Sequence, residues 1–260
     1  MFGWVARTVE GTSPALRFIV GGSLVPINAE GAVMKILNVA LTVHDLAGAV
    51  RFYRDVLGMP VDQDTDHAVV SAGSSRLSLT QGDAFNGVHH LAFGILPSEF
   101  ERAHAWLGAR VPLLAKNGQE TFAGSGGWDS RSVYFLGPED IILEFIARDA
   151  DANLETGDQE NPLILSISEI GIAVADVPSA AERLSTELGL PQFFDHDETF
   201  APVGNHDGLL ILVRPDRLWF PTDSLRAASG RLAVGIESAI ENTQLDLTPA
   251  ISITTVQGTH

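Results

Sequence analysis

The sequence has 260 residues, of which 45% are hydrophobic and 19% charged, and its formal net charge is −17. This composition is typical of a globular protein that can bury a core in one large domain or two small ones. The negative charge argues against binding to nucleic acid or to an anionic membrane surface, since phosphate groups would be repelled. The chain has no cysteine, which excludes disulfides, thiolate metal ligands and a cysteine nucleophile. We expect a cytoplasmic protein.

Residues 1–33 carry no trace of the pattern that organises the rest of the chain. They hold two arginines, scattered glycines and a weak apolar stretch that Gly21, Gly22 and Pro26 interrupt. The stretch is too short to cross a bilayer, and the layout of a signal peptide is missing. We expect a loose N-terminal extension, with Met34 as an alternative point at which translation begins.

One segment occurs twice in the chain. Residues 36–60 recur as residues 167–191, at a constant offset of 167 − 36 = 131 and with no gap. Each copy contains an apolar strand, an aspartate that suits a helix N-cap (Asp45 or Asp176), an amphipathic helix and a Leu-Gly pair that suits its end. A repeat of this size indicates a chain built of similar modules.

The first module is predicted to have the order βαβββ. After the strand and helix of the repeat, two short strands are expected at residues 67–71 and 76–81, with a turn at residues 73–75 between them. A second, more divergent module begins at Val88, and an offset of 52 aligns Asn38 with His90. Its helix opens at Pro97, and strands at 132–136 and 141–146 close it. Residues 34–147 should therefore form one domain of two modules.

The second half of the chain is predicted to hold further, less complete modules. Residues 148–162 are acidic and polar and should form a linker. A third module spans residues 163–222, and its strand at 209–213 is apolar throughout, which is typical of a strand buried on both faces. Within residues 223–260, strands are expected at 231–237 and 250–255 and are interpreted as the remnant of a fourth module.

The opening of the first module resembles that of the vicinal oxygen chelate superfamily, which includes glyoxalase I, bleomycin-resistance proteins and extradiol dioxygenases. The similar features are the strand, Asp45, the helix with Phe52-Tyr53, and Leu57-Gly58, and the stretch YFLGPEDIILEF at residues 134–145 resembles the superfamily's closing turn and strand. This resemblance implies an α+β fold in which paired βαβββ modules form curled mixed sheets around a cavity.

The resemblance also implies where a metal would bind, because metal ligands of this superfamily lie on the first and last strands of each module. These positions are Asn38 and Ser78 in the first module, and His90 and Glu144 in the second. Only the second pair keeps the familiar imidazole and carboxylate, so a divalent metal (Fe, Mn, Ni or Zn) is expected at His90 and Glu144. Glu144 is either a ligand or the catalytic base.

Other residues receive weaker assignments. Asn38 and Ser78 are expected in the substrate cavity, and Trp128, which follows a glycine-rich loop, is expected to cover it. Glu169 occupies the first-strand position of the third module, but its last-strand counterpart falls among residues 209–211, which offer no ligand. Glu169 is therefore interpreted as a surface or edge-strand acid. The Trp219-Phe220 pair favours core or interface packing, with a pocket lining as the alternative.

Two functions fit these residues. The first is a metal-dependent enzyme, a lyase, isomerase or dioxygenase, that chelates a small oxygenated substrate. Lyase or isomerase chemistry is preferred over ring cleavage, because position 38 lacks the second histidine of an iron site. The alternative is a metal-independent protein that sequesters a small molecule in an apolar cavity, as bleomycin-resistance proteins do. A homodimer is possible in either case, since such modules often complete each other across a dimer.

Overall fold

The computed structural model describes residues 17–20, 23–26, 34–124, 127–154, 161–194, 196–228 and 230–256. The chain forms two compact units, Met1–Ala32 and Val33–His260. In the first unit, β1 (Arg17–Val20) pairs antiparallel with β2 (Ser23–Pro26), and the rest of the expected N-terminal extension lies outside the described residues. None of the helices in the described ranges is long and apolar enough to cross a membrane.

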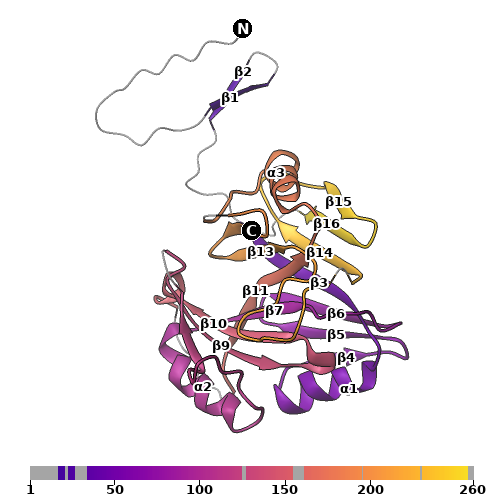
Figure 1. Ribbon diagram of the computed structural model, residues 1–260, viewed down its shortest axis with the longest axis vertical. Helices are drawn as coiled ribbons and strands as arrows, with labels where there is room; N and C mark the ends of the chain where they lie inside the picture. The colour runs from indigo at the N-terminus through magenta and orange to yellow at the C-terminus, as the bar shows by residue number, and fades with distance from the viewer. Residues whose placement is uncertain are drawn as a thin grey trace. The chain divides into compact units, whose positions relative to one another are not determined.

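The first module has the predicted βαβββ order (Figure 1). Its helix begins at Asp45, whose carboxylate accepts a hydrogen bond of 2.8 Å from the backbone N–H of Gly48, and it ends before Gly58, which has a positive φ of 65°. The elements are β3 (Lys35–Val43), α1 (Leu46–Arg51) with a π-helical turn (Phe52–Val56), β4 (Val61–Gln63), β5 (His67–Ala72) and β6 (Ser75–Gln81). β6 runs parallel to β3, so the first and last strands are neighbours.

The second module repeats this arrangement, with β10 parallel to β7. Its elements are β7 (His90–Ile95), a 3₁₀ turn (Pro97–Glu99), α2 (Phe100–Gly108), β8 (Thr121–Ala123), β9 (Ser130–Leu136) and β10 (Ile142–Arg148). Arg148, which the sequence pattern assigned to the linker, is instead the last residue of β10 and is buried. A 3₁₀ turn (Asp149–Asp151) follows, and residues 155–160 of the predicted linker lie outside the described part of the chain.

The third module has one strand fewer than the first two. It consists of β11 (Ile164–Ala173), α3 (Val177–Leu188), β12 (Phe200–Asn205) and β13 (Gly208–Val213). An isolated bridge between Gln192 and Val203 stands where the other modules place an additional strand. All six residues of β13 are buried, which confirms the burial that its apolar sequence predicted.

The C-terminal strands are β14 (Leu232–Glu237), β15 (Gln244–Thr248) and β16 (Ile251–Val256). The sequence pattern predicted β14 and β16 but not β15, whose five residues include an exposed glutamine and an exposed aspartate. β14 runs parallel to β16, as the first and last strands of the three modules do. Residues 238–243, between β14 and β15, form an irregular segment with bends in place of a helix.

The modules pair differently from the expectation. β11 pairs antiparallel with β7, and β14 pairs antiparallel with β3. The second module therefore pairs with the third, and the first with the C-terminal strands, whereas we expected the first and second to pair. In each of the first two modules, the first strand pairs along one edge with the last strand of the same module. Its other edge is free to pair with a different module. The alternation of apolar residues specifies the strand but not the partner that takes this free edge.

The two pairs join into one sheet. Among the described residues the sheet has 14 strands, and β3 and β11 meet at the single residue pair Ile36 and Ile167. Figure 1 shows α1 and α2 near one end of this unit and α3 beside β15 and β16 near the other.

We predict that Asp176→Ala lowers the free energy of unfolding by about 1 kcal/mol, because the Asp176 carboxylate caps α3 by accepting a hydrogen bond of 3.0 Å from Ser179 N–H. Urea denaturation measures the effect. Asp176→Asn retains a capping oxygen and should lose much less, and Glu182→Ala, on the exposed face of α3, serves as the control. Equal losses in the Ala and Asn variants would contradict the capping role.

Candidate metal centre

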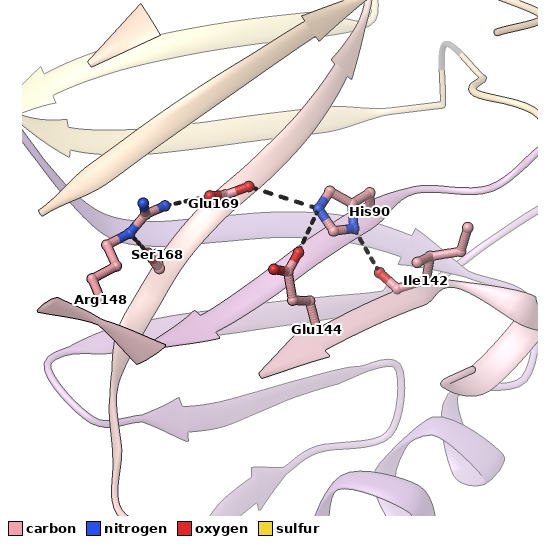
Figure 2. Close-up of polar contacts among 6 residues, drawn as sticks. All are labelled: His90, Ile142, Glu144, Arg148, Ser168 and Glu169. Carbon is pink, nitrogen blue, oxygen red and sulfur yellow. Dashed lines mark hydrogen bonds and ion pairs between the residues drawn. The ribbon is translucent and has the colours of Figure 1, made fainter. Parts of the chain in front are cut away.

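Three buried side chains meet on neighbouring strands: His90 on β7, Glu144 on β10 and Glu169 on β11 (Figure 2). Strand register brings them together. Glu144 and Glu169 both lie opposite Ala92, one from each side of β7. Ala92 is two residues from His90 and so faces the same side of the sheet, where its short side chain leaves room for the three longer ones.

The donor atoms converge on a single point. His90 Nε2 lies 3.4 Å from Glu144 Oε2 and 3.9 Å from Glu169 Oε2. The other ring nitrogen, Nδ1, lies 3.2 Å from the backbone oxygen of Ile142, to which its N–H donates. This hydrogen bond fixes the ring and directs Nε2 at the carboxylates, as outer-shell hydrogen bonds do in metal-binding histidines.

The electrostatics of the group are strongly coupled. Burial by itself would lower the pKa of His90, but hydrogen bonding to Glu144 and Glu169 and their negative charges outweigh it and raise the pKa to about 9. Burial would likewise raise the pKa of Glu169, but the hydrogen bond to His90 and the charge of Arg148 lower it instead. Without a bound metal ion, His90 is therefore protonated, and its charge together with that of Arg148 balances the two carboxylates.

Arg148 forms an ion pair with Glu169 on the side away from His90 (Figure 2). Its side chain is 1% exposed, Nη2 donates to Glu169 Oε1, and Nε donates to Ser168 Oγ at 3.1 Å. Glu169 Oε1 is thus engaged by Arg148, while Oε2 faces His90. Arg148 was not predicted as a site residue, because a polar, acidic stretch follows it directly and the sequence pattern placed it in the linker.

This donor set fits a divalent metal. The ligand atoms of His90, Glu144 and Glu169 lie within 4.8 Å of one another. Imidazole and carboxylate bind such ions at about 2.0–2.2 Å, which places neighbouring ligand atoms roughly 3–4 Å apart. The two distances from His90 Nε2 fall in this range. One imidazole and two carboxylates suit borderline and hard ions such as Mn, Fe and Zn.

The location of Glu169 corrects the expectation that it is a surface or edge-strand acid. It is 4% exposed, because β11 is an interior strand between β7 and β13. That expectation assumed that a second ligand must come from the last strand of the same module, where the equivalent residue is the apolar Ile211. The partners come instead from the second module, across the β7–β11 pairing.

Asn38 and Ser78 lie apart from this group. Ser78 Oγ donates to Asn38 Oδ1 at 3.0 Å, and neither residue lines the cavity beside His90. Their positions are nonetheless equivalent to those of His90 and Glu144. Ala40 is flanked by Ser78 on one side and Ala233 on the other. Ala92 is flanked in the same way by Glu144 and Glu169. The pairing of the first module with the C-terminal strands separates Asn38 and Ser78 from the donors of the second module.

A cavity of about 690 Å³ opens in front of the three donors. Ile211 faces it, and aromatic side chains form much of its wall, namely Phe122, Trp128, Tyr134, Phe200, Trp219 and Phe220. Trp219 packs against the ring of His90 at 5.2 Å between centroids, and its Nε1 donates to the backbone oxygen of Val88 at 3.0 Å. The Trp219-Phe220 pair was predicted to pack in the core or an interface, with pocket lining as the alternative. In the structure Trp219 packs against His90, and both residues line the cavity.

Tyr134 is the polar member of the aromatic wall. Burial, together with the negative charges of Glu144 and Glu169, raises the pKa of its hydroxyl well above the usual value. The hydroxyl therefore stays protonated and can donate its hydrogen bond to Glu144, which is one cause of the raised pKa. No lysine or arginine lines the cavity in the described ranges.

Comparisons with known proteins agree with this architecture. The sequence profile of the Glyoxalase/Bleomycin resistance protein/Dioxygenase superfamily matches residues 35–187. Among solved structures, a glyoxalase I variant from Zea mays is similar with a TM-score of 0.50 and 17% identity, over 79% of this chain and 75% of that one. A putative dioxygenase from Bacillus subtilis is similar with a TM-score of 0.54 and 14% identity, over 77% and 69% of the two chains.

The search of curated proteins finds no match. The low identities to solved structures establish the fold alone, whereas the profile covers more than half of the residues, from β3 into α3. The chain belongs to the glyoxalase/bleomycin resistance protein/dioxygenase superfamily.

Proposed function

We propose that this protein is a divalent-metal-dependent enzyme that acts on a small oxygenated substrate, with His90, Glu144 and Glu169 as the metal ligands. The observation that carries the proposal is the convergence of three buried donors at the wall of a cavity of about 690 Å³. Buried acids that served only the fold would not need to face such a space.

The number of ligands favours catalysis over a structural role. Structural zinc sites are closed by four protein ligands, whereas catalytic sites keep a position open for water or substrate. Here the corresponding position on the last strand of the third module is Ile211, an apolar side chain that lines the cavity. A metal held by the three donors would thus have free positions toward the cavity, where two oxygens of a substrate can reach it.

A bound divalent metal would act as a Lewis acid that stabilises negative charge on a substrate oxygen. The charges of the protein side chains also favour negative charge on a substrate oxygen. With His90 neutral, the charges of Glu144, Glu169 and Arg148 sum to −1, and a divalent ion would bring the site to +1. An oxyanion in the cavity would then neutralise the site.

Glu144 is the better placed of the two carboxylates to accept a proton. Glu169 is held by the ion pair with Arg148, whereas among the described residues Glu144 forms an ion pair with His90 alone. Tyr134, whose hydroxyl remains protonated, is a hydrogen-bond donor on the same wall. A carboxylate base suits the proton transfers at carbon that a lyase or isomerase requires.

The cavity walls favour an uncharged substrate with an apolar or aromatic portion. Aromatic rings surround the space, and among the described residues no lysine or arginine lines it. Ring cleavage is less favoured than lyase or isomerase chemistry, because the iron site of ring-cleaving oxygenases uses two histidines and one carboxylate, and this site has one histidine and two carboxylates.

Metal-free binding of an aromatic ligand is the second candidate function. It is favoured by the aromatic wall and by the ability of a protonated His90, together with Arg148, to balance both carboxylates without a metal. The two candidates differ in one measurable property, the metal content of the purified protein.

We predict that protein purified without a histidine tag contains close to one equivalent of Fe, Mn, Ni or Zn by elemental analysis, and that His90→Ala loses it. Asn38→Ala, at the equivalent position of the other module pair, is the matched control and should keep the metal. Chelation should lower the melting temperature, since a ligand that binds only the folded state stabilises it. Metal-free protein whose melting temperature does not respond to added metal would support the binding protein instead.

We predict that Arg148→Met destabilises the metal-free protein by about 3–5 kcal/mol, because it leaves His90 alone to balance the two buried carboxylates of Glu144 and Glu169. Added Mn²⁺ should restore part of this loss by neutralising Glu169. Arg148→Lys, which keeps a positive charge, should lose less. Arg54→Met, which removes an exposed ion pair with Asp55, should cost at most about 1 kcal/mol. Urea unfolding with and without Mn²⁺ measures all three, and a loss in Arg148→Met that metal leaves unchanged would contradict the assignment of Glu169 as a ligand.

A further inference from the structure

We propose a second small-molecule site, which takes a neutral molecule with one aromatic ring and one hydrogen-bonding group. The site is a cavity of about 190 Å³ where the first and second modules meet. His89 lines this cavity, whereas the next residue, His90, lines the cavity of the metal centre. Successive strand residues face opposite sides, so the two cavities lie on opposite faces of the chain at this point.

The size and lining of the cavity select an apolar ring. Buried apolar side chains that surround it are Leu41, Ala49, Leu79, Val88 and Ile141. An apolar cavity of about 150 Å³ in another protein stays dry and binds benzene, so the present volume accepts a single substituted ring. The exposed residues His44, Ala84 and Glu139 also line it and give it a mouth at the surface.

His89 supplies a polar contact that the protein leaves unused. It is 6% exposed, its ring packs against Phe85, and its Nε2 has no hydrogen-bond partner among the described residues. Gly230 lies against this atom, because a Cβ at residue 230 would come within 2.8 Å of Nε2, so the imidazole fits here only beside a glycine. Buried polar atoms without partners are rare in native proteins and call for an explanation such as a bound molecule. A hydroxyl or carbonyl group on the ring would provide the missing partner.

The charges around the cavity argue for a neutral ligand. No lysine or arginine of the described residues lines it. The carboxylate that does so, Glu139, accepts hydrogen bonds of 2.6 and 2.7 Å from the backbone N–H groups of His44 and Asp45 at the start of α1. Both bonds go to Oε1 and join the two modules at the exposed mouth, so the carboxylate lies outside the buried apolar part of the cavity that receives the ring.

The proposal is tested by ¹⁹F NMR titration of the full-length protein with 4-fluorophenol and with fluorobenzene, which lacks the hydroxyl group. Both probes should bind saturably. His89→Phe keeps a ring beside Phe85 but removes the polar atom, and it should weaken 4-fluorophenol binding by about tenfold, the effect of losing one hydrogen bond. Binding of fluorobenzene should stay within about twofold of the original protein by the same reasoning.

A second variant locates the binding and does not depend on His89. Ala84→Phe places a large side chain at the mouth and should abolish binding of both probes. Ala47→Phe, on an exposed position of α1 outside the lining, is the matched control and should leave both unchanged. Binding that survives Ala84→Phe would place the probes elsewhere, such as the aromatic cavity of the metal centre, and would overturn the proposal. Absence of saturable binding to the original protein would also overturn it.

Discussion

β11 pairs with β7 in an antiparallel register that sets Glu169 beside Ala92, directly across from Glu144 on β10. The candidate metal centre depends on this contact, because no single module contains all three donors. A shift of β11 by one residue would turn Glu169 to the opposite face of the sheet and put Ser168 or Ile170 in its place. Arg148, Ser168 and the aromatic wall are arranged around the position that this register gives to Glu169.

The chain contains the same geometric arrangement twice, and only one of the two carries metal-binding side chains. Around Ala92 the side chains are His90, Glu144 and Glu169, whereas the equivalent positions around Ala40 hold Asn38, Ser78 and Ala233. Asn38 and Ser78 are uncharged, and they form a hydrogen bond with each other. This half of the sheet therefore has no charged group at the equivalent positions. Strand pairing therefore preserves the fold in both halves, while the chemistry resides in one half.

Much of the fold could be predicted from the sequence because it follows from local physics. The N-cap at Asp45 and the left-handed glycine at Gly58 depend on residues within one turn, and they formed as expected. The full donor set could not be predicted, since it depends on which module occupies the free edge of β7. Glu169 and Arg148 are 79 and 58 residues from His90 along the chain (169 − 90 and 148 − 90), and no local pattern reports that they meet.

The order of pairing gives the chain a nested organisation. The second and third modules are consecutive in sequence, whereas the partners of the outer pair, β3 and β14, lie at opposite ends of Val33–His260 and enclose the inner pair. Contacts between distant segments form slowly, because closing a long loop costs entropy. During synthesis the inner half, with its donors, can assemble first. The free edge of β3 stays unpaired until the last strands emerge. An unpaired strand edge can pair with another chain, so this edge can promote aggregation during that interval.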